Sequence, residues 1–219
     1  MIKFSVNLKR TATAAFAGAL LLTGLGCGQP GAIAPGAMNT PGISRAMSET
    51  QENEPGWRGP KEDLGHFFKV NDTLYRGQQP SDKGFEMLKE KGIKTVVYLH
   101  FSKSQAAHEK KVVEGLGMNF VHIPMSWLTP PKESQIKQWL AVTGDANQGP
   151  VFVHCQHGRD RTGTMVGIYR IAYEGWSFDQ AYAEMKEMGF RTFFLGLTHG
   201  VKKFAKAYEK DVPQTAAAY

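Results

Sequence analysis

The chain has 219 residues, of which 42% are hydrophobic and 21% are charged, so it can form one domain with a real core and additional segments. Its formal net charge is +6 at pH 7, but Lys3, Lys9 and Arg10 lie in an N-terminal targeting segment and the remainder carries about +3. This mild positive excess suits an anionic substrate. The lysines are scattered and do not form the basic and aromatic array of a nucleic-acid-binding surface, so no nucleic acid partner is predicted.

The N-terminus has the pattern of an export signal. Positive residues precede an apolar run from about Thr11 to Gly26, which predicts a signal peptide over residues 1–27 and is shorter than the roughly 20 residues of a membrane span. The stretch Gly24-Leu25-Gly26-Cys27 resembles a bacterial lipoprotein cleavage box, in which Cys27 becomes the lipidated first residue. Cleavage after Ala34 would instead release a soluble protein. We therefore expect an exported protein that is periplasmic, anchored to a membrane through Cys27, or secreted.

The next segment separates the signal from the folded part. Residues 28–63 are rich in Gly, Pro, Ala, Ser and Asn and show no hydrophobic periodicity, which predicts a flexible linker. Such a linker would let a tethered enzyme stand off a membrane surface. The catalytic domain is expected over residues 64–212.

Strands and helices alternate through that domain. Residues 67–70 and 73–76, joined by Asn71-Asp72, indicate a small hairpin. Helices are predicted over about 81–91, 104–116, 131–143 and 161–174, and strands over 94–100, 119–123 and 151–154. The remainder from Ser177 has a helical pattern, with a start signal at Ser177 and a stop at Gly189. This alternation predicts an α/β domain with a short, mostly parallel central sheet flanked by helices.

The most informative segment of the chain is Val151-Phe152-Val153-His154-Cys155-Gln156-His157-Gly158-Arg159-Asp160-Arg161-Thr162-Gly163. An apolar stretch delivers Cys155 into a short loop that closes on Arg161, where a helical pattern begins. This layout suits phosphate binding on backbone N–H groups while a thiolate attacks phosphorus. A cationic neighbour or a helix N-terminus lowers the pKa of a thiol, and both are available to Cys155. Arg161 offers a planar fork of donors for phosphate, and Gly158 can adopt the positive φ that a tight loop needs.

The Cys-x5-Arg-Thr-Gly spacing resembles the signature loop of the cysteine-dependent protein tyrosine and dual-specificity phosphatases. The resemblance implies the protein tyrosine phosphatase-like fold at dual-specificity size, and phosphate ester hydrolysis through a cysteinyl-phosphate without a metal or cofactor. It further implies that Thr162 donates its hydroxyl to the Cys155 sulfur and that His154 orders the loop and biases the cysteine pKa. The other predicted phosphate-binding residues are Gln156, His157, Gly158, Arg159 and Gly163.

A second stretch agrees with this resemblance. Leu74-Tyr75-Arg76-Gly77-Gln78-Gln79-Pro80 and Gly92-Ile93-Lys94-Thr95-Val96-Val97-Tyr98-Leu99 resemble the atypical dual-specificity group, which includes fungal and plant inositol pyrophosphate phosphatases and many bacterial relatives. The resemblance covers about residues 65–210. Arg76 either faces the phosphate site or fixes the turn, and the sequence leaves both roles open.

The general acid is less clearly marked than the nucleophile. Most tyrosine phosphatases carry it as an aspartate on a separate loop, but the matching residues 120–131 contain no Asp or Glu. Asp145 precedes the strand at 151–154, so it is expected at the opposite end of the sheet. Asp160 is therefore the best candidate, because the Gly-x-Asp-Arg-Thr form resembles myotubularin-type lipid phosphatases and secreted bacterial phosphatases in which this aspartate is proposed as the acid. The alternative is that Asp160 only orders Arg159 or Arg161.

Other functions fit less well. The only cysteines are Cys27 and Cys155, so a thiol-relay arsenate reductase lacks its resolving cysteines, and a rhodanese-like sulfurtransferase would not require Arg-Thr-Gly after the loop. The seven histidines show no His-x3-His or Cys-x2-Cys spacing, so no metal is predicted. A non-enzymatic pseudophosphatase is disfavoured because Cys155, Asp160 and Arg161 are all present.

The loop also constrains the substrate. It suits a phosphoprotein carrying phosphotyrosine, and His157 and Arg159 add positive charge that suits a polyphosphorylated inositol compound or a phosphoinositide. The sequence leaves the choice among these substrates open.

Overall fold

The computed structural model describes residues 62–211, with side chains described for residues 62–209. The predicted signal peptide, the Cys27 lipidation site and nearly all of the predicted linker lie outside the described residues, so they stay predictions. Within residues 62–211, no helix combines the length and the apolar character that crossing a membrane requires.

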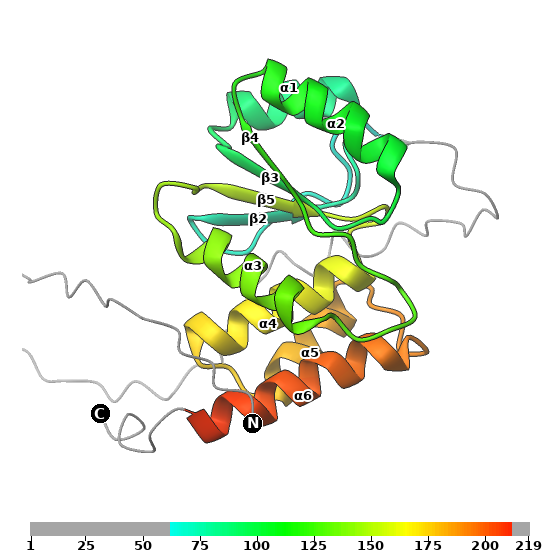
Figure 1. The fold of residues 1–219 in the computed structure, drawn as a ribbon, viewed down its shortest axis with the longest axis vertical. Helices are drawn as coiled ribbons and strands as arrows, with labels where there is room; N and C mark the ends of the chain where they lie inside the picture. The colour runs from blue at the N-terminus through cyan, green and yellow to red at the C-terminus, as the bar shows by residue number, and fades with distance from the viewer. Residues whose placement is uncertain (1–61, 212–219) are drawn as a thin grey trace, which may run out of the picture. The chain divides into compact units, whose positions relative to one another are not determined.

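The domain is built on a five-stranded sheet in the order β1-β2-β5-β3-β4 (Figure 1). The strands are β1 (Phe68–Lys69), β2 (Leu74–Gly77), β3 (Thr95–Tyr98), β4 (Asn119–His122) and β5 (Val151–His154). β2, β5, β3 and β4 are parallel, whereas β1 is antiparallel to β2. The short, mostly parallel sheet that the sequence predicts is therefore confirmed.

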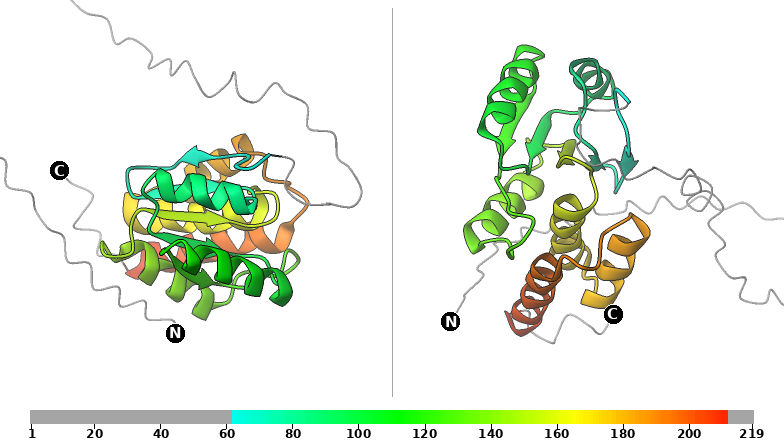
Figure 2. Two further views of the ribbon diagram at one scale, coloured as in Figure 1. Left: turned by 90° about the horizontal axis from the view of Figure 1, so that it is seen from above. Right: turned by 90° about the vertical axis from the view of Figure 1, so that its right-hand side faces the viewer.

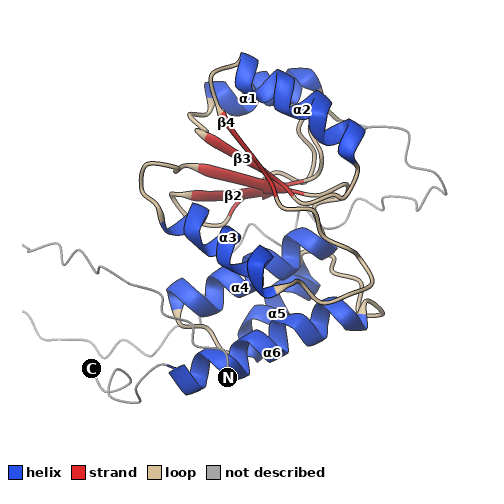
Figure 3. Ribbon diagram, viewed as in Figure 1, coloured by secondary structure: helices blue, strands red, loops and turns tan. Residues whose placement is uncertain are grey.

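Helices cover both faces of this sheet (Figures 2 and 3). One face carries α1 (Asp82–Glu90) and α2 (Lys103–Gly115), and the other carries α3 (Glu133–Gly144), α4 (Asp160–Glu174), α5 (Phe178–Glu187) and α6 (Leu195–Asp211). The helical pattern after Ser177 is interrupted at residues 188–194, which join α5 to α6. Gly189 has a φ of +79°, as expected of a helix stop.

The central strands β3 and β5 are buried along their whole length because helices cover both sides of the sheet. Val96 and Phe152 pack with Phe85 and Leu88 of α1. On the opposite face lies the larger cluster, which includes the strand residues Val97, Val151 and Val153, together with Trp139 of α3 and Met165 of α4. Trp139 also donates its indole N–H to the Met165 carbonyl at 2.7 Å, which ties α3 to α4.

β5 lies between β2 and β3, and this places the predicted loop. His154, its last residue, is level with Gly77 of β2 and Tyr98 of β3. Cys155 therefore leaves the sheet at the carboxyl edge, where ligands bind in open α/β sheets. Asp145 is the C-cap of α3 and precedes β5, so it lies toward the opposite edge, as predicted.

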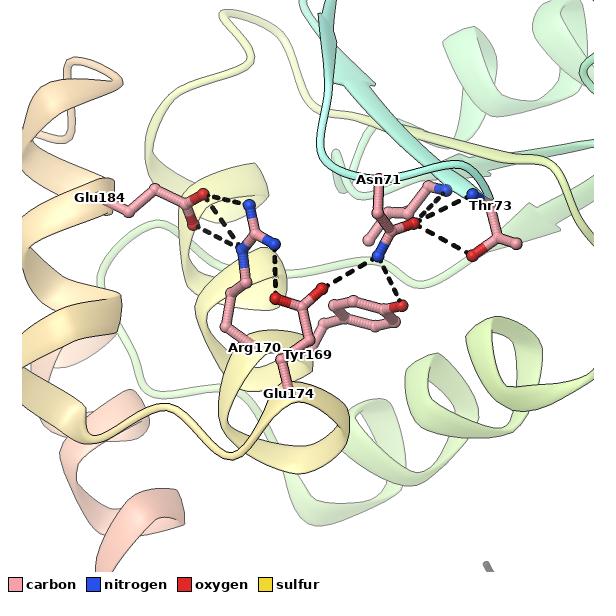
Figure 4. A network of polar contacts seen from close by, with 7 residues as sticks. Asn71, Thr73, Tyr169, Arg170, Glu174 and Glu184 are labelled. Carbon is pink, nitrogen blue, oxygen red and sulfur yellow. Dashed lines mark hydrogen bonds and ion pairs between the residues drawn. The ribbon is translucent and has the colours of Figure 1, made fainter. Parts of the chain in front are cut away.

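Asn71 joins the β1–β2 hairpin to α4 (Figure 4). Its side-chain oxygen accepts hydrogen bonds from the backbone N–H and the hydroxyl of Thr73. Its amide nitrogen donates to the Tyr169 hydroxyl at 2.9 Å and to Glu174 at 3.0 Å. The turn that the sequence marks as Asn71-Asp72 is thus held against the helix that follows the loop.

Arg170 continues this network from α4 to α5 (Figure 4). Its guanidinium pairs with Glu174 on its own helix and with Glu184 on α5. These contacts fix the orientation of α4, whose first turn forms one wall of the predicted site.

Candidate active site

Cys155 is the first residue after β5, and α4 begins at Asp160 after residues 156–159. Its side chain is buried, at 2% relative exposure. Burial by itself raises the pKa of the thiol, but the net shift is downward. The opposing causes are the charge of Arg161 and hydrogen bonds from the Thr162 hydroxyl and from the backbone N–H groups of Thr162 and His157. The loop thus favours a thiolate at the point where the sequence predicts a nucleophile.

Arg161 and Thr162 lie in the first turn of α4, beside Cys155, and both are buried. Nη1 of Arg161 has no hydrogen-bond partner among the described residues, and Oγ1 of Thr162 has none among their nitrogen and oxygen atoms. A buried donor without a partner costs free energy that an anionic ligand would recover. Gly163 follows in the same helix, and its backbone N–H donates to the Arg159 carbonyl.

Gly158 is required by the close approach of the loop to β2. Its φ is +70°, and a Cβ atom there would lie 2.4 Å from the Gly77 carbonyl oxygen. No other residue fits without displacing one of the two backbones. The residues after β2 also contact the loop through a hydrogen bond from the backbone N–H of Gln79 to the Gln156 carbonyl, at 3.3 Å.

Arg76 supports the loop from the neighbouring strand. It is 2% exposed, and its Nη2 donates to the Gly158 carbonyl at 2.9 Å. Burial lowers its pKa to about 10, so the side chain remains charged at neutral pH, and the nearby Cys155 counts among the charges that oppose this shift. The sequence left open whether Arg76 faces the phosphate site or fixes the turn. In the structure, its guanidinium binds the backbone of the loop at Gly158.

Asp160 is buried and its carboxylate is bound by Arg191. The backbone N–H of Arg191 donates to Oδ1 at 2.9 Å, and its guanidinium reaches Oδ2 through Nη2 at 2.7 Å and Nε at 3.2 Å. The guanidinium also lies 4.7 Å from the ring centroid of Phe194. Arg191 belongs to the α5–α6 connection and was not identified from the sequence, because a single arginine after a helix stop carries no distinctive pattern. The structure thus pairs Asp160 with an arginine that the sequence analysis did not consider.

His154 is fully buried and lies against a buried carboxylate. Its Nε2 is 3.1 Å from Oε2 of Glu109, a residue of α2 whose side chain is 2% exposed. Oε1 of the same carboxylate accepts a hydrogen bond from the Gln79 side chain at 2.6 Å. Glu109 was also missed from the sequence, although its helical spacing from the buried Ala106 and Val113 places it on the inward face of α2.

Positive charge gathers around the loop. His157 is half-buried, and burial followed by the charges of Arg191 and Arg159 lowers its pKa. His100, which follows β3, has a pKa lowered to about 4 by burial and then by Arg161, so it is neutral at pH 7. Arg159 lies 3.4 Å from Nε2 of His66. Within residues 62–209, no group of three or more His, Cys, Asp or Glu side chains is arranged to hold a metal ion.

Comparison with protein families identifies one match over most of the described domain. Residues 62–195 match the family described as a DSP-PTPase phosphatase fused to NAD+ kinase. The matched segment begins before β1 and ends at the first residue of α6, so it contains the complete sheet and the loop after β5.

Three similar proteins illustrate this relationship. The dual specificity protein phosphatase TpbA of Pseudomonas aeruginosa is 26% identical over 155 residues, which cover 71% of this chain and 69% of TpbA. The inositol diphosphatase DSP3 of Arabidopsis thaliana is 25% identical over 56% of this chain and 61% of its own length. A crystal structure of P. aeruginosa TpbA in complex with pTyr shares the fold with a TM-score of 0.53 at 21% identity, over 66% of this chain and 90% of that chain.

We predict that Gly158→Ala costs far more activity than Gly175→Ala. Both glycines have positive φ, so alanine costs about 1–2 kcal/mol of stability at either position. Only at position 158 does the new Cβ also collide with the β2 backbone, since no described heavy atom lies within 4 Å of a Cβ at Gly175. Displacement of the loop by about 1 Å should lower kcat/KM roughly 100-fold. Aryl phosphate hydrolysis together with urea unfolding of both variants measures this difference, and equal loss of activity in the two would contradict it.

Proposed function

Because the chain belongs to the family described as a DSP-PTPase phosphatase fused to NAD+ kinase, and is a cysteine-dependent phosphatase, we propose that Cys155 is its nucleophile and that residues 155–161 form its phosphate-binding loop. The observation that carries this proposal is the position of a buried thiol at the carboxyl edge of the sheet, with Arg161 and with N–H and O–H groups directed at the sulfur, which together lower its pKa. A thiolate held in this way attacks phosphorus, while the same donors hold phosphate oxygens.

The reaction proceeds in two steps. In the first, the Cys155 sulfur forms a bond to phosphorus as the ester P–O bond breaks, and the leaving oxygen takes a proton. Arg161 and the loop N–H groups stabilise the charge that develops on the equatorial oxygens. In the second step, water attacks phosphorus, the P–S bond breaks, and inorganic phosphate leaves. The hydroxyl of Thr162, which lowers the pKa of the thiol, also stabilises the departing thiolate.

Asp160 is proposed as the group that protonates the leaving oxygen. It lies in the first turn of α4 beside Arg161, but Arg191 binds both of its oxygens. Catalysis through Asp160 therefore requires the Arg191 guanidinium to move away when substrate binds. The competing role for Asp160 is to fix Arg191 and the α5–α6 connection against the loop. The two roles predict different responses to substitution.

The surroundings of the loop support two substrate classes. Three large apolar side chains are exposed: Phe101 after β3, Trp127 after β4 and Phe193 before α6. Such side chains suit the ring of phosphotyrosine. The positive charges of Arg159 and Arg191 favour a second phosphate, as on a polyphosphorylated inositol compound. Phosphate release from a phosphotyrosyl peptide, an inositol polyphosphate and phosphoinositide vesicles distinguishes these classes by their kcat/KM values.

We expect Cys155→Ser to abolish turnover while phosphate binding remains. Serine leaves the Arg161 guanidinium and the loop N–H groups in place but removes the anionic nucleophile. Hydrolysis of an aryl phosphate measures the first quantity, and calorimetric titration with inorganic phosphate measures the second. Turnover at the wild-type rate would refute the assignment of the nucleophile.

Asp160→Asn should separate the two roles of this carboxylate. If Asp160 is the acid, the variant loses about 10²–10⁴-fold on an alkyl phosphate and little on p-nitrophenyl phosphate, whose leaving group needs no proton. Arg191→Met is the matched control, because it removes the partner of Asp160 and leaves the carboxylate in place. A similar loss on both substrates in both variants would show that the pair holds the loop and that the proton comes from elsewhere.

We also propose that the enzyme is exported and anchored to a membrane through a lipid on Cys27. The support is the apolar run that ends at Gly24-Leu25-Gly26-Cys27 and the linker composition that follows. Expressed in a bacterium with labelled palmitate, the full chain should incorporate the label and sediment with membranes, and Cys27→Ala should do neither. Unlabelled protein in the soluble periplasmic fraction would instead favour cleavage after Ala34.

A further inference from the structure

Residues 76–79, here called the β2 end segment, bind two alternate carbonyl groups of the loop that is proposed to hold phosphate. The backbone N–H of Gln79 donates to the Gln156 carbonyl at 3.3 Å. Nη2 of Arg76 donates to the Gly158 carbonyl at 2.9 Å. Both carbonyls therefore point toward the same segment, and this constrains the direction of the N–H groups on which the reaction depends.

A trans peptide unit directs its C=O and its N–H to opposite sides, and the peptide units after Gln156 and Gly158 are both trans. The first shows the consequence. Its carbonyl faces the β2 end segment, and its N–H, which belongs to His157, is directed at the Cys155 sulfur. The second is held at its carbonyl from the same segment, so its N–H, which belongs to Arg159, also points away from β2.

The β2 end segment has a fixed position from which it can direct the loop. The backbone N–H of Gln78 donates to the Gly65 carbonyl at 3.1 Å. A Cβ atom on Gly77 would lie 2.8 Å from the ring of Phe152 and 3.3 Å from the Gly65 carbonyl oxygen. Because Phe152 belongs to β5, the segment is packed directly against the strand from which the loop departs.

Arg76 brings a buried charge to its contact with the loop. Its guanidinium is 2% exposed, remains cationic at neutral pH, and has no hydrogen-bond partner for Nη1 among the described residues. A hydrogen bond from a charged donor is stronger than one between neutral groups. It also polarises the peptide that accepts it, so the N–H of that peptide becomes a stronger donor. An anion bound in the loop offsets part of the cost of burying this cation.

We propose that Arg76 is a positioning residue for phosphate binding, because it holds the peptide unit between Gly158 and Arg159 so that the Arg159 backbone N–H donates to the substrate phosphate. This inference rests on the proposed phosphate-binding role of residues 155–161. Arg76 acts through the peptide unit and does not itself touch the phosphate. The side chain of Arg159 takes no part in this contact.

The first test is an NMR titration of the ¹⁵N-labelled full chain with inorganic phosphate. A hydrogen bond to phosphate moves an amide proton to higher chemical shift, so we expect the Arg159 amide resonance to move in this direction as phosphate binds. A response of other loop amides without one from Arg159 overturns the role of Arg76. If no amide of residues 156–161 responds, the proposed phosphate-binding loop itself is refuted, and this failure is distinct from the first.

Arg76→Met provides the second test, since it removes the charge and the hydrogen bond but keeps a long side chain. We expect it to lose the Arg159 response, to keep that of other loop amides, and to weaken phosphate binding and kcat/KM about 10–100-fold, as for the loss of one charged hydrogen bond. Arg170→Met is the matched control, because the Arg170 guanidinium is largely buried but binds Glu174 and Glu184 instead of the loop.

The control should keep the Arg159 response. Equal loss of that response in Arg76→Met and Arg170→Met, or no loss in either, overturns the proposal. If Arg76→Met does not fold, the titration of the wild-type chain decides the question by itself.

Discussion

The buried sulfur of Cys155, whose pKa is lowered by the groups around it, is the feature on which the rest of the site depends. Cys155 is almost without solvent exposure, so burial acts against its ionisation, yet the net effect of its surroundings lowers the thiol pKa. The compensation comes from Arg161 and from donors of Thr162 and His157. These groups must be aimed within hydrogen-bond distance, because the stabilisation of an anion by N–H and O–H groups weakens steeply with misalignment. Precise backbone geometry in residues 155–161 is therefore a requirement of the chemistry.

That geometry is maintained by three buried contacts from outside the loop. Arg76 of β2 binds the Gly158 carbonyl, Arg191 after α5 binds Asp160, and Glu109 of α2 meets His154. Each joins the loop to a different part of the chain, and each involves at least one charged side chain that is nearly or fully buried. Charged hydrogen bonds are shorter and stronger than neutral ones, but a buried charge that loses its partner is costly. The loop is therefore held rigidly before any phosphate binds, as electrostatic stabilisation of a transition state requires.

The sequence was sufficient for the parts of this arrangement that follow local rules. Short apolar runs such as Val151-Phe152-Val153, the start signal at Ser177 and the Cys155-to-Arg161 spacing led to the correct sheet, helices and family. Glu109 and Arg191 were not found because their roles arise from tertiary contacts, across 45 and 31 residues respectively. Glu109 is an ordinary glutamate on an amphipathic helix until the fold places His154 opposite it. Local periodicity shows which face of a helix is buried, but it does not show which charge the opposite element contributes.

The cations around the loop suit the two anions that the proposed reaction brings together, the Cys155 thiolate and the substrate phosphate. A thiolate and a phosphate dianion repel each other, and Arg161 alone cannot neutralise both. The charges of Arg191 and Arg159 lower the pKa of the half-buried His157, so their positive charge extends to the loop. Arg76 contacts the loop from β2, through the Gly158 carbonyl. Arg191 is already paired with Asp160, so a ligand that binds its guanidinium directly competes with that carboxylate. If Asp160 is the proton donor proposed above, a substrate anion that takes its place on Arg191 would free the carboxylate for that role.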